Sequence, residues 1–344
     1  MKLFKYLTII FLSCFIVSCG TNSGKNKSDF AIITNAKDNT ISNAETLKLS
    51  IENLKNYKID SVNYTLNGKS IKENTDLKSV KLGIHNIEAT LYYNNKQQKV
   101  SSKITVLNNE PPKIYTYNII NEYPHDIASY TQGLEFYNDT LYESTGQQGK
   151  SKLRKVDYKT GEILKNINLA NQYFGEGLSV LNDKVYQLTW QGGIGFVYNA
   201  TTLEKLKDFK YGKSKEGWGL CNDGNTLYKS DGTENIWLLN TNTLAEEDHI
   251  QVYTNKGKIV EINELEWING EIYANRWQKD GVAIINPENG AVIGVIDFSP
   301  LKKRVTQHEA LDVLNGIAYN PKTKTIFVTG KYWDKLFEVE IVEN

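Results

Sequence analysis

A short segment recurs five times in the second part of the chain, and this repeat restricts the fold more than any other sequence feature. Each copy has a polar or aromatic residue, then a small or acidic residue, then an aliphatic residue. The aliphatic residues are Leu134, Leu178, Leu220, Leu265 and Ile317, which are 44, 42, 45 and 52 residues apart. A period of this length is typical of folds in which similar units pack beside one another.

Each repeat unit contains patterns for four strands. A second strand pattern follows the first after a turn, as at 141–144 and 185–188, a third comes next, and turns such as 157–162 lead to a fourth. Four strands in ~40–45 residues are typical of a propeller blade. The sequence therefore predicts an all-β chain with a five-bladed β-propeller over residues 113–344. The last unit has only three strand patterns, and the run 114–120 would supply its fourth strand and close the ring.

A different pattern precedes the repeats. Residues 30–108 show short stretches that alternate between apolar and polar residues, with turns such as Asn67-Gly68 between them. Alternation with period two predicts a small immunoglobulin-like β-sandwich, in which no catalytic constellation is visible. Pro111 and Pro112 then interrupt any sheet and indicate a linker. A spacer is the expected role of the sandwich, with ligand binding as the alternative.

The first 18 residues have the pattern of a lipoprotein signal peptide. Lys2 and Lys5 precede an apolar run at 7–17, which is shorter than the ~20 residues that a membrane-spanning helix needs. Cys19 stands where this run ends and is the predicted lipidation site, followed by a flexible tether over 19–29. We therefore expect an exported bacterial lipoprotein, held at the outer membrane by a lipid anchor on Cys19. An ordinary signal peptide, with an incidental Cys19, is the alternative.

Charge, cysteine content and histidine spacing restrict the classes of function that the chain can have. The chain has 40 Lys and Arg against 40 Asp and Glu, a balance that argues against a nucleic-acid partner. Cys221 is the one cysteine outside the signal segment, and its surroundings favour a small core residue over a nucleophile. The four histidines have no local metal-ligand spacing, so no zinc motif is predicted. A structural cation in the propeller channel is a hypothesis that no motif requires.

Equivalent positions in the repeats should lie at equivalent places around the central channel. Two such sets contain acidic, basic, amide and indole side chains. The residues that open the first strands are Gln132, Glu176, Trp218, Asn263 and Asn315. The residues five after the start of each second strand are Gly146, Trp190, Gly232, Trp277 and Lys331.

This mixture of side chains indicates a catalytic site. Three indoles would form a water-poor wall that binds a small group, and such a wall would raise the pKa of Glu176 into a range useful for proton transfer. Lys331, Gln132 and Asn263 are suited to donate to a developing oxyanion. For any single residue the alternative is structural, because tryptophans often pack between blades and a Glu before Gly can belong to a turn.

The chain also resembles the plant (papaya-type) glutaminyl cyclase family. The resemblance runs in order from about residue 114 to 342 and rests on the segments 123–126, 130–134, 153–156, 173–178, 187–190, 216–220, 229–232, 263–266, 274–278, 314–317 and 328–333. It implies a five-bladed propeller that needs no zinc and converts the N-terminal glutamine of peptides or proteins to pyroglutamate, with release of ammonia.

The resemblance also implies roles for individual residues. Glu176 would move a proton from the substrate amine to the leaving ammonia, and Lys331, with Gln132 or Asn263, would stabilise the tetrahedral oxygen. Trp190, Trp218 and Trp277 would enclose the glutamyl residue of the substrate.

Two rival functions are consistent with the pattern. One is a non-catalytic lipoprotein whose propeller binds a peptide or a glycan, although a pure binder has no need of Glu176 and Lys331 together. The other is a hydrolase or lyase acting on sugars. Such enzymes usually use paired carboxylates, and the first set of equivalent positions offers only Glu176.

Overall fold

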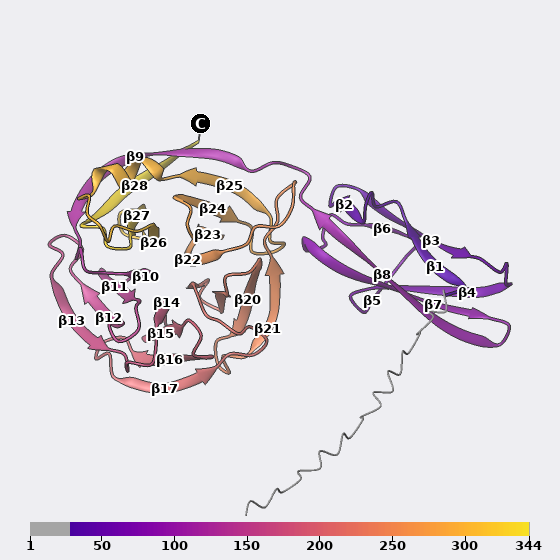
Figure 1. Cartoon of the computed structure of the whole chain (residues 1–344), viewed down its shortest axis with the longest axis horizontal. Helices are drawn as coiled ribbons and strands as arrows, with labels where there is room; N and C mark the ends of the chain where they lie inside the picture. Colours follow the sequence, from indigo (N-terminus) through magenta and orange to yellow (C-terminus); the bar gives the residue numbers. More distant parts are fainter. Residues whose placement is uncertain (1–27, 344) are drawn as a thin grey trace, which may run out of the picture.

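The computed structural model describes residues 28–343, and apart from one short 3-10 helix its regular elements are all β-strands (Figure 1). The prediction of an all-β chain is confirmed. The predicted signal peptide, Cys19 and most of the predicted tether lie outside the described residues. Within residues 28–343, no helix is long and apolar enough to cross a membrane.

The first eight strands form two sheets around a shared apolar core. The strand order is β1-β3-β6 in one sheet and β2-β8-β7-β4-β5 in the other. Residues of β7 alternate between buried and more exposed positions because successive side chains of a strand point to opposite faces. Leu91 of this strand packs in the same core as Phe30 and Leu47 of the other sheet. These strands are β1 (Phe30–Thr34), β2 (Thr40–Ser42), β3 (Thr46–Asn53), β4 (Ile59–Leu66), β5 (Lys69–Ile71), β6 (Asn74–Asp76), β7 (Gly83–Tyr93) and β8 (Lys96–Leu107).

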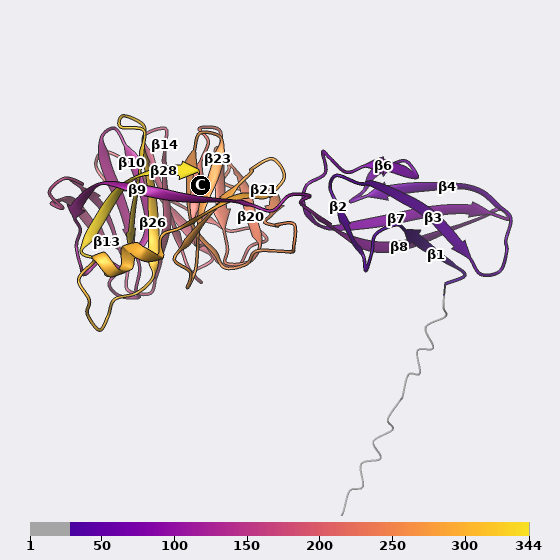
Figure 2. The same ribbon diagram turned by 90° about the horizontal axis from the view of Figure 1, so that it is seen from above.

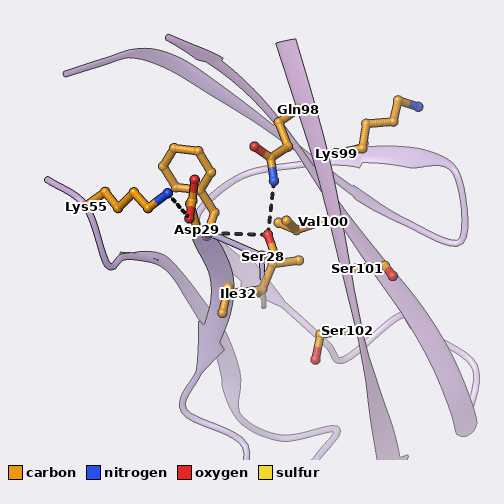
Figure 3. A pocket seen from close by; sticks show the side chains of 11 residues that line it. Ser28, Asp29, Ile32, Lys55, Gln98, Lys99, Val100, Ser101 and Ser102 are labelled. Atoms are coloured by element: carbon orange, nitrogen blue, oxygen red, sulfur yellow. Dashed lines mark hydrogen bonds and ion pairs between the residues drawn. The ribbon is translucent and has the colours of Figure 1, made fainter. Parts of the chain in front are cut away.

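A cavity of about 940 Å³ lies in this N-terminal part, beside β1 and β8 (Figure 3). Lys55 forms an ion pair of 3.1 Å with Asp29 at its edge, and Gln98 donates a 3.0 Å hydrogen bond to Ser28. The cavity lies at the point where the described residues begin, and none of the predicted site residues lines it.

The remaining strands form a ring beside the sandwich (Figures 1 and 2). No strand covers 108–112, as expected for the segment with two prolines. The ring consists of β9 (Lys113–Pro124), β10 (Thr131–Tyr137), β11 (Thr140–Thr145), β12 (Lys152–Val156), β13 (Ile163–Asn168), β14 (Gly175–Leu181), β15 (Lys184–Thr189), β16 (Ile194–Asn199), β17 (Lys205–Lys210), β18 (Leu220–Asn222), β19 (Thr226–Ser230), β20 (Asn235–Asn240), β21 (Glu246–Gln251), β22 (Ile262–Ile268), β23 (Glu271–Arg276), β24 (Gly281–Ile285), β25 (Val292–Asp297), η1 (Ser299–Arg304), β26 (Leu314–Asn320), β27 (Thr325–Gly330) and β28 (Lys335–Glu343).

The ring strands pair in sets of four that match the sequence repeat. Three separate sheets have the orders β10-β11-β12-β13, β14-β15-β16-β17 and β18-β19-β20-β21. An eight-stranded sheet, β22-β23-β24-β25-β9-β28-β27-β26, contains the rest. The first strands touch one another in the cyclic order β10, β14, β18, β22, β26 and back to β10. In Figure 1 β10, β14, β22 and β26 lie around the centre, while β13, β17, β21, β25 and β9 follow the outer edge.

Strand β9 closes the ring. It pairs antiparallel with β28 from Tyr115 to Pro124, as the sequence predicted for the run 114–120. It also pairs in parallel with β25 through residues 113–115, which joins the strands β22–β25 and β26–β28 into one sheet. The edge of β9 that faces β28 is thus paired along most of its length, while the edge that faces β25 is paired only at its start.

Buried glutamates link the first strands to one another. The edge of each first strand faces the centre, where its N–H groups have no further strand to pair with. Glu264 accepts hydrogen bonds from the N–H groups of Leu134 at 3.3 Å and Ile317 at 3.0 Å, so one carboxylate joins three neighbouring strands. Burial raises the pKa of Glu264 well above its ordinary value. Among residues 28–343, no group of three or more His, Cys, Asp or Glu is placed to hold a metal ion, and the channel cation stays an untested hypothesis.

Candidate active site

A cavity of about 310 Å³ opens at one end of the first strands. In each repeat the start of the first strand and the end of the second lie side by side, because the two strands form an antiparallel hairpin. The structure brings all seven predicted catalytic and substrate-binding residues together in this cavity and adds Tyr130 and Phe174. Its lining consists of Tyr130, Gln132, Phe174, Glu176, Trp190, Trp218, Asn263, Trp277 and Lys331.

Glu176 is the acidic group of the cavity, and only 4% of its surface is exposed. Its Oε1 accepts a 2.9 Å hydrogen bond from Nε2 of Gln132, while its Oε2 has no partner among the described residues. Burial raises the pKa of Glu176 well above its ordinary value; the positive charge of Lys331 opposes this shift, and the negative charge of Glu216 adds to it. The carboxyl group can therefore hold a proton at a higher pH than an exposed glutamate.

Asn315 determines which way the Gln132 amide faces. Its Nδ2 donates to the carbonyl oxygen of Thr131 at 2.9 Å and to Oε1 of Gln132 at 3.1 Å. With its oxygen occupied in this way, Gln132 must direct its NH₂ group to Glu176. The chain Asn315–Gln132–Glu176 thus holds the carboxylate in one orientation. Asn315 does not line the cavity.

Lys331 is the basic group of the cavity and is 2% exposed. Its ammonium lies 4.5 Å from the centre of the Tyr130 ring, which is a cation–π contact. Burial lowers the pKa of Lys331, against the opposing effect of the charges of Glu176 and Asp312. Asn263, whose Oδ1 has no partner among the described residues, adds a polar group to the same wall.

Aromatic rings make up the rest of the cavity wall. Trp218 and Trp277 meet edge to face with their ring centres 6.0 Å apart, and Phe174 meets Trp190 in the same way at 5.7 Å. Trp190 and Trp277 remain 38% and 37% exposed, so they form the mouth of the cavity. The wall is apolar except for the few polar groups that face the substrate space, as in typical small-molecule sites.

Glu216 orients two of the indoles. The sequence did not identify it as a residue of the site. Its Oε2 accepts hydrogen bonds from Nε1 of Trp190 at 2.8 Å and from Nε1 of Trp218 at 2.9 Å. Buried Lys229 donates to the backbone oxygen of Glu216 at 2.9 Å and so holds this loop in place. One carboxylate therefore sets the orientation of both rings.

The sequence repeat contains a pattern from which three unpredicted residues of the site could have been identified. Tyr130, Phe174 and Glu216 each stand two positions before a member of the first set: Gln132, Glu176 and Trp218. They form a third set of equivalent positions, which places them beside the first set in space. Cys221, by contrast, is a fully buried core residue of β18, as the sequence indicated, and burial raises the pKa of its thiol well above the usual value.

Comparison with known proteins agrees with this geometry. The sequence model of the family described as "Glutamine cyclotransferase" matches residues 88–341, which is most of the chain. This chain belongs to the glutamine cyclotransferase family. The resemblance inferred from the sequence motifs is thereby confirmed. The match begins inside β7 and includes the whole ring up to β28.

Two known members show how closely this glutamine cyclotransferase follows its family. The glutaminyl-peptide cyclotransferase of Arabidopsis thaliana is 41% identical over 232 residues, which are 67% of this chain and 72% of the plant protein. The crystal structure of the glutaminyl cyclase of Myxococcus xanthus superposes with a TM-score of 0.63 at 37% identity. That superposition covers 68% of this chain and 99% of the other.

Proposed function

We propose that this chain is a glutaminyl-peptide cyclotransferase that converts the N-terminal glutamine of peptides or proteins to pyroglutamate and releases ammonia. The observation that carries the proposal is the environment of Glu176. A buried carboxyl group with one unpartnered oxygen faces a cavity of about 310 Å³, next to Lys331 and a wall of indoles. The cavity offers no His or Cys, and we propose that proton transfer by Glu176 needs no metal ion.

In this reaction the α-amine nitrogen of the substrate bonds to Cδ of its own side-chain amide. The bond from Cδ to the amide nitrogen then breaks, and ammonia leaves. Glu176 accepts a proton from the attacking amine and donates it to the departing nitrogen, so the carboxylate is regenerated in each turnover. An α-amine has a pKa of ~7.7–8.0, and the raised pKa of Glu176 brings the two groups closer in proton affinity.

We assign the other polar groups by the contacts they already make. Gln132 donates one of its two Nε2 hydrogens to Glu176, so we assign it to holding the carboxylate. This leaves the Lys331 ammonium to stabilise the negative oxygen that develops on Cδ. The unpartnered Oδ1 of Asn263 is suited to accept a hydrogen bond from a nitrogen of the substrate. The tryptophans would exclude water and so disfavour hydrolysis of the side chain to glutamate.

We further interpret the ring as a five-bladed β-propeller and the N-terminal part as an immunoglobulin-like sandwich. The five sets of four strands and the cyclic contacts of the first strands support the blade count. We also propose that the chain is exported and anchored to the outer membrane through a lipid on Cys19, on the basis of the sequence of residues 1–29.

The direct test of the proposed function is ammonia release from Gln-Ala-amide by the purified chain, with and without a strong chelator. We expect release in both conditions, together with a product lighter by one molecule of ammonia in mass spectrometry. Release that the chelator abolishes would overturn the metal-free assignment. No release in either condition would favour the non-catalytic peptide-binding function instead.

A Glu216→Gln variant tests the electrostatic part of the proposal. The negative charge of Glu216 raises the pKa of Glu176, so removing it should lower that pKa and keep the carboxylate ionised at lower pH. We expect the acidic limb of the pH profile of kcat to move down by roughly 0.5–1 pH unit. Glu261→Gln is the matched control, because Glu261 occupies the equivalent repeat position but its charge is not among the causes of the raised pKa of Glu176. An acidic limb that stays in place or moves up in Glu216→Gln would contradict the assignment.

A further inference from the structure

A second cavity, of about 480 Å³, lies next to the catalytic one. Tyr130 belongs to the lining of both cavities. The second cavity is formed mainly by the loop that follows β11, by the loop between β13 and β14, and by Tyr332. Strand β12 adds Lys152 and Arg154 to this lining, and the loop after β11 contributes Gly146 and Lys150.

The wall between the two cavities is aromatic and thin. The Tyr130 ring packs between Phe174, at 6.0 Å between ring centres, and Tyr332, at 5.3 Å. A Cβ at Gly146 would lie 2.5 Å from the Phe174 ring and 2.9 Å from the Tyr130 ring, so no side chain fits there. Three of the four equivalent positions in the other repeats carry large side chains, Trp190, Trp277 and Lys331, and the fourth is Gly232. The missing side chain at Gly146 therefore lets the two cavities lie back to back.

The second cavity is lined by three basic residues and no acidic one. Neither Lys150 nor Lys152 forms an ion pair with another described residue of the chain. Arg154 is 2% exposed, and its Nη1 donates to Asp126 at 2.9 Å and to Ser129 at 2.8 Å. Its Nε has no partner among the described residues. The cavity thus combines two lysines outside any ion pair with a buried guanidinium that is paired with Asp126 and, at 3.6 Å, with Glu143, and whose Nε alone lacks a partner.

We propose that this second cavity is a subsite for a carboxylate of the substrate peptide, downstream of its N-terminal glutamine. The inference rests on the proposed function, because the glutaminyl side chain must occupy the neighbouring cavity. The two cavities share Tyr130 and a peptide extends by at most ~3.3–3.6 Å per residue, so we place the second or third residue of the peptide in the second cavity. A carboxylate is the anionic group that a peptide can offer to lysine and arginine donors, either from an acidic side chain or from its C-terminus.

The test compares peptides that differ only in charge. The probes are Gln-Ala-Ala-amide, Gln-Glu-Ala-amide and Gln-Ala-Glu-amide for the side-chain source, and Gln-Ala against Gln-Ala-amide for the C-terminal source. We expect kcat/KM to be about three- to tenfold higher for a peptide whose carboxylate reaches the subsite, the range that one or two partly exposed ion pairs supply. About 0.5 M NaCl should reduce this preference, because the lysines are open to solvent.

The double variant Lys150→Gln/Lys152→Gln should lose the preference and turn over all peptides alike. The matched control is Lys165→Gln/Lys207→Gln, which removes the same charge from exposed positions on the outer strands β13 and β17. Equal kcat/KM for charged and neutral peptides in the unaltered protein would overturn the subsite. A preference that survives in Lys150→Gln/Lys152→Gln, or that is lost equally in the control, would also overturn it.

Binding measured by calorimetry separates the subsite from catalysis. Titrations use the Glu176→Gln variant, in which bound peptide is expected to persist, with and without the two lysine substitutions. Tighter binding of Gln-Glu-Ala-amide or Gln-Ala-Glu-amide than of Gln-Ala-Ala-amide supports the subsite even if no ammonia is released. Turnover of Gln-Ala-Ala-amide without any preference for charge supports the proposed function and refutes the subsite alone.

Discussion

Replacing Glu176 by Gln is expected to lower kcat by about 10²–10⁴-fold, the range that a positioned acid–base group contributes. The amide is close in size to the carboxyl group and can still accept the hydrogen bond from Gln132, so the cavity should keep its shape. The amide of the variant cannot accept and return a proton, so both the attack of the amine and the departure of ammonia should become slower. The measurement is the steady-state rate of ammonia release from Gln-Ala-amide, with thermal unfolding to show that the variant folds.

Glu135→Gln provides a close control for this substitution. Glu135 is also a buried glutamate of a first strand, its Oε1 accepts a hydrogen bond from Val180, and its Oε2 lacks a partner among the described residues. Burial raises the pKa of Glu135 to about 8. Its side chain does not line the catalytic cavity, so the control should retain activity. Undiminished turnover in Glu176→Gln, or an equal loss in Glu135→Gln, would contradict the role proposed for Glu176.

Replacing Lys331 by Gln should have the second largest effect, a fall in kcat/KM of about 10²–10³-fold. The neutral amide cannot match the ammonium in stabilising the oxygen that becomes negative during ring closure. The substitution should also change the pH profile. The charge of Lys331 lowers the pKa of Glu176, so its removal lets that pKa rise further and moves the acidic limb of kcat to higher pH. This is the opposite direction from the shift expected for Glu216→Gln.

The matched control for Lys331 is Lys155→Gln. Lys155 also lies over an aromatic ring, at 5.4 Å from the centre of Tyr142, and burial lowers its pKa, but it is outside the cavity. The control should keep the rate and the pH profile of the unaltered protein. A Lys331→Gln variant with a normal rate, or with an acidic limb that moves to lower pH, would refute the assignment of Lys331.

The position of the candidate site could be predicted from the sequence because the ring repeats. A residue at a given offset in one unit has a counterpart at the same offset in the next, and the fold places these counterparts around one centre. Gln132, Glu176 and Asn263 therefore converge although they are far apart in the chain. This inference needs only the repeat length and the strand pattern, and no knowledge of side-chain contacts.

The same reasoning missed residues whose importance depends on direct contacts. Glu216 was visible in the motif 216–220, but the hydrogen bonds that tie it to Trp190 and Trp218 appear only when atoms are placed. Asn315 was recognised as a member of the first set, without a role. Its hydrogen bond to Gln132 shows that it positions the carboxylate indirectly. The second cavity was not predicted because most of its lining comes from loops and from β12, and only Tyr130 and Gly146 belong to the sets of equivalent positions.

The sequence by itself determined the strand pattern, the repeat and the set of side chains that gather at one end of the ring. Periodicity is a property of the order of residues, so it can be read without coordinates. The tertiary structure alone decided how those side chains are charged and oriented. The pKa of Glu176 depends on how much water is excluded and on the nearby charges of Lys331 and Glu216, and the direction of the Gln132 amide depends on Asn315. Desolvation and hydrogen bonding are set by distances in space, and those distances exist only after the ring has closed.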